Sequence, residues 1–157
     1  GWLALVAQPR LSYVAPYGAA QTLGIEPQRL FARAVVANVA VQAGIDEVQW
    51  GQGGNRSLFL SDNAGPLRTL SIGSDTAFAL PWVLARLGRV RASLLVADLG
   101  GQRQTFPGAK LAAYKVSITP AARLELGAGL MSQFGGRGAP AMALDQRVAD
   151  LVPFITW

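Results

Sequence analysis

Asp46 and Glu47 are two neighbouring carboxylates, the residue type that catalyses glycoside hydrolysis. Paired carboxyl groups cleave glycosides when they flank one bond, one as the acid and the other as base or nucleophile. Adjacent residues of a strand point to opposite faces, however, so these two are poorly placed to flank one bond. We therefore predict that the pair does not hydrolyse glycosides.

A glycine-rich run, Gly51-Gln52-Gly53-Gly54, is of the kind that can cradle phosphate groups. A phosphate-binding loop also needs a Lys followed by Ser or Thr and then a helix, and neither pattern follows here. The sequence has no histidine and no cysteine, which removes the imidazole base, the thiol nucleophile and the usual zinc ligands. The sequence predicts no enzyme, no cofactor and no metal site.

The charges of the chain are few and scattered. Its 157 residues include 14 Lys or Arg and 9 Asp or Glu, for a formal net charge of +5. Only Arg86, Arg89 and Arg91 approach a cluster, whereas a nucleic-acid-binding protein usually gathers its basic residues on one face or run. We therefore predict no nucleic-acid partner.

The composition is apolar for a single domain of this length. Apolar residues make up 51% of the chain and charged residues 15%, against roughly 25% charged in an ordinary soluble domain. No window approaches the ~20 uninterrupted apolar residues of a membrane-spanning helix. The apolar residues are spread over short segments, which favours strands with one apolar face, directed to a large core or to lipid. The opening Gly1-Trp2-Leu3 does not resemble a signal peptide, so an exported protein would have lost its signal or the chain is an internal piece.

Strands are predicted along most of the chain. Residues 2–14 read as one strand, in which Pro9 indicates a bulge or a sheet edge. Residues 30–43 read as two strands joined by a tight turn at Ala37-Asn38, because asparagine tolerates positive φ. Further strands are expected at 67–72 and 90–98, and residues 21–29 are ambiguous.

The clearest pattern lies towards the C-terminus. Apolar and polar residues alternate with a period of two over 111–118 and again over 123–134, with a turn signal at 119–122, which predicts a hairpin. Residues 141–151 carry apolar residues at three- and four-residue spacing, which suits a short amphipathic helix. Pro81 indicates the start of a single helical turn or an extended connector.

We predict an all-β fold: an antiparallel up-and-down sheet or part of an outer-membrane β-barrel, with one or two short helices. The apolar row of the C-terminal hairpin meets a core in a soluble sandwich, or lipid in a barrel whose polar face lines the lumen. The local pattern does not separate these two. The stretch Gly44–Pro66 is predicted to be a strand end, a glycine-rich crossing and a short strand or extended segment.

Three motifs follow one another in a characteristic order: a Trp-Gly-x-Gly strand end, a leucine-rich segment and an Asn-Ala-x-Pro turn. Here they are Trp50-Gly51-Gln52-Gly53, Ser57-Leu58-Phe59-Leu60-Ser61-Asp62 and Asn63-Ala64-Gly65-Pro66-Leu67. Leu80-Pro81-Trp82, the hairpin and the run from Gln133 to Pro140 continue the series. With these motifs the chain resembles the Wzi-type capsule assembly proteins over roughly residues 30–150.

The resemblance implies a barrel in the outer membrane of a Gram-negative bacterium, in contact with membrane lipid. It also implies attachment or binding of capsular polysaccharide, as a lectin and without catalysis. Members of that family are much longer and carry a signal peptide and an N-terminal helical region. We therefore expect residues 1–157 to form one barrel-like domain that is an incomplete segment of a larger barrel.

Candidate carbohydrate-binding residues lie in the central stretch. Trp50 offers an aromatic face to the C–H side of a sugar ring, although a Trp at a strand end is often an anchor or an interfacial residue. Polar neighbours could hydrogen-bond a polysaccharide, although some of them could instead bond their own turn. These polar candidates are Asn55, Arg56, Asp62 and Asn63.

A second set of candidates shares the polar face predicted for the strands. In a barrel these residues would contact water, a plug or polymer in the lumen, and in a soluble domain they would be solvated. They are Arg33, Gln42, Lys115, Arg123, Glu125 and Gln133. Two rival functions remain: a soluble β-rich barrel around a small apolar ligand, and an outer-membrane pore without sugar recognition. The soluble barrel is disfavoured because 3–6, 35–41 and 94–96 are apolar on both faces.

Overall fold

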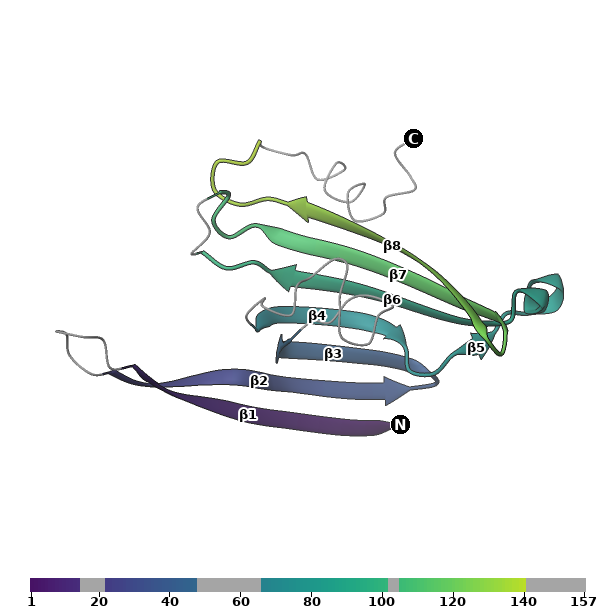
Figure 1. Ribbon diagram of the computed structural model, residues 1–157, viewed down its shortest axis with the longest axis horizontal. Coiled ribbons are helices and arrows are strands. Elements are labelled where there is room, and N and C mark those ends of the chain that lie inside the picture. Colours follow the sequence, from purple (N-terminus) through teal and green to yellow (C-terminus); the bar gives the residue numbers. More distant parts are fainter. Residues whose placement is uncertain (15–21, 48–65, 102–104, 141–157) are drawn as a thin grey trace.

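The chain forms one antiparallel sheet in the computed structural model, which describes residues 1–14, 22–47, 66–101 and 105–140. The strands pair in the order β1-β2-β3-β4-β6-β7-β8, and the short β5 pairs with β6 in line with β4 (Figure 1). Neighbours in sequence are therefore neighbours in the sheet, as predicted for an up-and-down fold. The strands are β1 Trp2–Val14, β2 Thr22–Val36, β3 Val39–Asp46, β4 Leu67–Ser74, β5 Phe78–Ala79, β6 Arg89–Asp98, β7 Lys110–Ala121 and β8 Leu124–Phe134.

The turn between β2 and β3 is the predicted two-residue hairpin. Ala37 and Asn38 both have positive φ, of 47° and 69°, as a turn matched to the twist of the strands requires. The amide of Asn38 also donates to the carbonyl of Thr76 at 3.1 Å, and its side-chain oxygen accepts from the Thr76 N–H at 2.8 Å. These bonds fasten the turn to the connection after β4.

The hairpin of β1 and β2 confirms the expectation for Pro9. Pro9 lies opposite Pro27, and the register shifts between Gln8 and Pro9. Proline cannot donate to the ladder, so it is tolerated beside a bulge and on an edge strand. The extra residue of the bulge is Gln28 on β2, and β1 is an edge of the described sheet. The ambiguous residues 21–29 belong to β2 from Thr22 onward.

The β7–β8 hairpin is confirmed, but its turn is shorter than predicted. β7 continues to Ala121, and the register shifts between Ile118 and Ala121 where Pro120 interrupts the ladder. Of the two alternatives at Pro81, a helical turn or an extended connector, the structure has the first: a 3-10 helix, η1, Trp82–Leu87. No helix among the described residues is long and apolar enough to cross a membrane. The helix expected at 141–151 and most of the central stretch lie outside the described residues.

The pairing register gives the sheet one apolar face and one polar face. Rows of aliphatic side chains run across the strands on the apolar face. One such row is formed by Leu5, Ala32, Ala43, Leu70, Val96 and Ala112, and it ends at Ser132 on β8. The polar face carries the alternate residues, such as Arg33, Gln42 and Ser71 in one row. Each strand therefore keeps the two-residue alternation read from the sequence.

The aliphatic rows are open on β1 to β4, where Leu5 is 76% exposed, Ile25 70% and Leu70 55%. On β6 and β7 the same face includes the buried residues Val90 and Ala112. The buried cluster is small and lies on the opposite, polar face, where Leu95 and Ala113 pack with Met131 in one row. The apolar side chains thus project away from the sheet instead of meeting one another inside a sealed interior.

Candidate functional site

A polar network holds together the ends of β2 and β3. The side-chain Nε of Arg29 donates to Oδ1 of Asp46 at 2.7 Å, and Nε2 of Gln42 donates to Oδ2 at 2.7 Å. The backbone N–H of Glu47 also donates to Oδ1 at 2.9 Å. Asp46 is buried, so these donors compensate the desolvation of its charge.

The second carboxylate of the pair has a different partner. Glu47 is exposed, and its Oε1 accepts from Nε2 of Gln28 at 2.9 Å. Each carboxylate is therefore held by a different set of neighbours: Asp46 bonds along β2 and β3, and Glu47 bonds to the bulged segment of β2. Asp46 is the last residue of β3 and pairs with Leu67, the first residue of β4. The hydrogen bonds to Asp46 therefore stabilise the strand ends that are joined by the β3–β4 connection.

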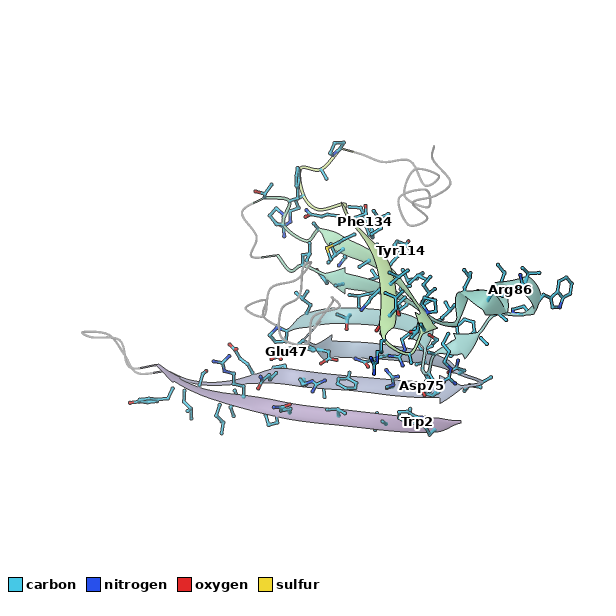
Figure 2. The ribbon with its side chains drawn as sticks, turned by 45° about the vertical axis from the view of Figure 1, so that its right-hand side comes forward. Trp2, Glu47, Asp75, Arg86, Tyr114 and Phe134 are labelled. Atoms are coloured by element: carbon cyan, nitrogen blue, oxygen red, sulfur yellow. The ribbon has the colours of Figure 1, made fainter. Side chains whose placement is uncertain are left out.

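A second ion pair lies at the opposite end of the sheet. Nη2 of Arg33 donates to Oδ1 of Asp75 at 2.7 Å, although the two residues lie on β2 and just beyond β4. Figure 2 shows Asp75 and Trp2 towards one end of the strands and Glu47 towards the other. The polar face is therefore tied by an ion pair at each end.

Aromatic rings stand beside these arginines on the polar face. The Arg29 guanidinium lies 5.4 Å from the centroid of the Phe31 ring, and that of Arg33 lies 6.0 Å from the Trp2 ring. Rings next to fixed donors are what a sugar-binding surface requires, since the ring packs against C–H groups and the donors bond hydroxyls. Sequence reasoning did not single out these rings, although Phe31 shares the strand parity of Arg33.

Five of the six predicted polar-face residues share one face of the sheet. Arg33 pairs with Gln42, Lys115 with Gly129 and Gln133 with Leu111, and the ladder places all of them on the same side. Arg123 lies in the turn before β8, and Glu125 is exposed near the start of that strand. Glu125 has the same parity on β8 as Gln133, so the structure brings five of the six to a common face and leaves Arg123 in the turn.

The candidates Trp50, Asn55, Arg56, Asp62 and Asn63 lie outside the described residues. The flanking strands are described: β3 ends and β4 begins at the end of the sheet where Arg29 bonds Asp46. The β6–β7 connection opens at the same end, where the residues that follow β8 also leave the sheet.

Charges interrupt the apolar face near this end. Arg68 pairs with Asp98, which pairs with Lys110, so three charged residues form a row across β4, β6 and β7. The Lys110 ammonium lies 2.5 Å from a carboxylate oxygen of Asp98. Beyond this row, towards the other end, the apolar face of β6 and β7 is free of charge.

Comparison with known proteins agrees with this geometry. The profile of the family described as capsule assembly protein Wzi matches residues 15–152. No curated protein matches the chain. A solved structure with the same fold is Wzi of Escherichia coli, described as an outer membrane protein involved in group 1 capsule assembly and as a carbohydrate-binding β-barrel.

That structure and this chain are 24% identical, with a TM-score of 0.67. The likeness covers 78% of this chain and 27% of the other, so this chain spans about a quarter of the length of that relative. The open sheet corresponds to part of a barrel wall. Because the family profile covers most of the sequence, the chain belongs to the Wzi family of capsule assembly proteins.

Proposed function

We propose that this chain forms part of the wall of an outer-membrane β-barrel that binds capsular polysaccharide during capsule assembly, without catalysis. One observation carries the proposal: aliphatic rows are exposed on one face, while the ion pairs of Arg29 and Arg33 and their hydrogen bonds lie on the other. The charged row of Arg68, Asp98 and Lys110 borders the apolar face at one end. This is the arrangement of a membrane barrel, with an apolar exterior and a polar lumen.

The exposed rows need an apolar environment. Removing one Val, Leu or Ile side chain from water is worth about 1.5–3 kcal/mol, so a whole face of such residues left in water would favour aggregation. Lipid satisfies that face without a second protein layer. The Gram-negative outer membrane is the location that the family membership supports.

We assign polysaccharide binding to the polar face and to the connection between β3 and β4. The polar face offers arginines beside rings, at Arg29 with Phe31 and Arg33 with Trp2. The connection carries Trp50, Asn55, Arg56, Asp62 and Asn63. Both carboxylates of the Asp46–Glu47 pair already serve neighbouring donors, which supports binding rather than hydrolysis.

We further propose that the barrel is larger than this sheet. β1 and β8 are the edge strands of the described sheet, and each leaves one row of backbone groups without a partner strand. A membrane-spanning sheet has to close, because unpaired backbone groups in hydrocarbon cost several kcal/mol each. Additional strands between β8 and β1 would close it.

The experiment is a heat-modifiability gel on the protein folded in detergent. A closed barrel stays compact in the sample buffer until it is boiled, so the unboiled band should migrate faster than the boiled band. A protein that remains monomeric in buffer without detergent and gives one band in both lanes would refute the membrane barrel. Binding to purified capsule is then measured on the folded species.

A further inference from the structure

The short helix η1 presents an unusual concentration of exposed apolar side chains. Trp82 is 93% exposed, Val83 73% and Leu84 53%, and none of the six residues of η1 is buried. No charged residue lies between Phe78 and Arg86 in the sequence. The segment projects beyond the ends of the neighbouring strands (Figure 1).

The backbone of Trp82 is in the left-handed region, with φ of 59°. A bulky residue rarely adopts this conformation, which costs roughly 1–2 kcal/mol relative to the right-handed region. No burial of η1 among the described residues offsets this cost. Strain of this kind often marks a segment whose function depends on how a side chain is displayed.

The apolar face of the sheet leads directly into η1. Phe78 of β5 pairs with Val90 of β6, and Val90 pairs with Ile118 of β7, so all three lie on the apolar face. The return from η1 is packed tightly on β7, because a Cβ on Gly88 would lie 2.0 Å from the carbonyl oxygen of Thr119. The helix is therefore fixed to the sheet and is not a loose tail.

The height of the apolar band can be measured on β1. Its apolar-face residues run from Leu3 to Tyr13, which is about ten steps of about 3.4 Å, or about 34 Å along the strand. At a strand tilt of about 40°, this corresponds to a height of about 26 Å, close to the ~25 Å band of outer-membrane barrels. β1 alone therefore spans the apolar layer.

On β7 the same band is too short. It begins at Ala112, after the charged Lys110, and ends at Ile118, which gives about 20 Å along the strand and a height of about 16 Å at the same tilt. The same row across the sheet that contains Lys110 on β7 contains Leu30 on β2 and Ala7 on β1. On β2 and β1 this row is uncharged, so the apolar band continues through it. The band thus crosses the sheet obliquely, as tilted strands require, and on β7 about 10 Å of it falls beyond the turns.

We propose that η1 is a lipid anchor that supplies this missing part of the band. Trp82, Val83 and Leu84 enter the boundary between phospholipid headgroups and acyl chains, and Arg86 reaches the headgroup phosphates. Trp at the interface and Arg beside it match the chemistry of that layer. The inference rests on the proposed function, because it needs the sheet to span a membrane.

Phospholipid is favoured over a protein partner by size. A standard protein interface involves about 20–30 residues a side, whereas η1 has six residues. The connections at this end also include the two-residue turn Ala37-Asn38 and the β7–β8 turn. Short connections are typical of the periplasmic end of such barrels, so the lipid would be the phospholipid of the inner leaflet.

The test uses single-tryptophan forms of the full-length protein, in which every Trp but one is replaced by Phe. One form keeps Trp82, and its matched control keeps Trp2, which stands beside Arg33 on the polar face. Both are folded into phosphatidylcholine vesicles, with and without bromine on the acyl chains near the headgroup. We expect bromine to quench Trp82 and to leave Trp2 unquenched. In vesicles without bromine, the emission of Trp82 should be shifted to the blue relative to the unfolded protein in water, because its ring enters an apolar layer.

Folding in the vesicles is checked separately by the heat-modifiability gel. If the barrel forms and bromine leaves Trp82 unquenched while a water-soluble quencher reaches it, the anchor is refuted and the helix would be free for a protein partner. If no heat-modifiable species forms, the proposed function itself fails and the anchor fails with it. A second variant, Arg86→Gln, should lose part of its preference for vesicles with anionic lipid, and an unchanged preference would remove Arg86 from the anchor.

Discussion

Arg33 and Asp75 form a 2.7 Å ion pair across 42 positions of sequence and join β2 to the connection after β4. Because β3 lies between β2 and β4, the pair clamps three strands at the turn end of the polar face. Side chains of both residues are about a quarter to a third exposed, so solvent screens the interaction.

Asp75→Asn should therefore destabilise the folded protein by about 1 kcal/mol, mainly through the lost charge-assisted bond. The measurement is the midpoint of urea unfolding in detergent or lipid. Arg10→Gln serves as the control, since Arg10 is exposed on β1 opposite Glu26 and its side chain forms no ion pair with a described residue. Equal midpoints for wild type and Asp75→Asn would show that the pair contributes nothing measurable.

The carboxylate of Asp46 should matter more than that of its neighbour Glu47. Asp46 is buried and accepts three hydrogen bonds, so Asp46→Asn places an NH₂ donor against donors and should cost about 1–3 kcal/mol. Glu47 is exposed, and Glu47→Gln should change stability by less than about 0.5 kcal/mol. Comparable losses from both variants, measured by urea unfolding, would contradict the network described here.

The turn chemistry and the strands were predictable because their signals are local. Positive φ at Ala37-Asn38, the bulge at Pro9 and the alternation over the last two strands follow from residues a few positions apart. The sequence did not decide whether the apolar face meets a core or lipid, because both environments select the same alternation. The exposure of Leu5, Ile25 and Leu70 on the apolar face supports the proposal that this face meets lipid.

Contacts between side chains that are distant in sequence could not be predicted from the sequence. The bond from Arg29 to Asp46 spans 17 positions and depends on the register of β2 against β3, which a one-residue slip would destroy. The rings beside the arginines were missed for the same reason, since Trp2 meets Arg33 only through the β1–β2 pairing. The conformation of η1 depends on its attachment at Gly88 to β7, which no local pattern signals.

Gly44 provides a test of the register itself. Its φ is 143°, and a Cβ at this position would lie 2.2 Å from the carbonyl oxygen of Leu30 and 2.6 Å from the Cα of Phe31. Gly44→Ala would push β2 away from β3, so we expect a loss of more than about 2 kcal/mol, at the large end for single substitutions. Gly101→Ala is the matched control, because a Cβ there meets nothing within 4 Å. If Gly44→Ala unfolds at the same urea concentration as the wild type, the register of β2 against β3 described here is wrong.

Lysine substitutions at two neighbouring positions of β3 test which face of the sheet meets lipid. Val41 lies on the apolar face and Gln42 on the polar face. Lys on the lipid face of a barrel costs about 2–4 kcal/mol near the midplane, whereas a lumen position tolerates charge. Val41→Lys should therefore lower the folded fraction in vesicles, measured by the heat-modifiability gel. Gln42→Lys should lose less, because it loses only a hydrogen bond to Asp46. The reverse order would mean that the polar face, not the apolar one, meets lipid.

Capsule binding is expected to depend on Trp50. If its ring stacks on a sugar, Trp50→Ala should weaken binding of purified capsular polysaccharide by about tenfold, in line with the ~1–1.5 kcal/mol of a good aromatic contact, while Trp50→Phe retains most of the affinity. The measurement is equilibrium binding to the folded barrel, with the gel as the check that both variants fold alike. Trp50→Ala with unchanged affinity would move the site to the polar face, where Phe31→Ala is then the informative variant because its ring stands beside Arg29. If neither variant binds more weakly, the barrel wall described here does not contact the polymer and sugar recognition lies on other strands.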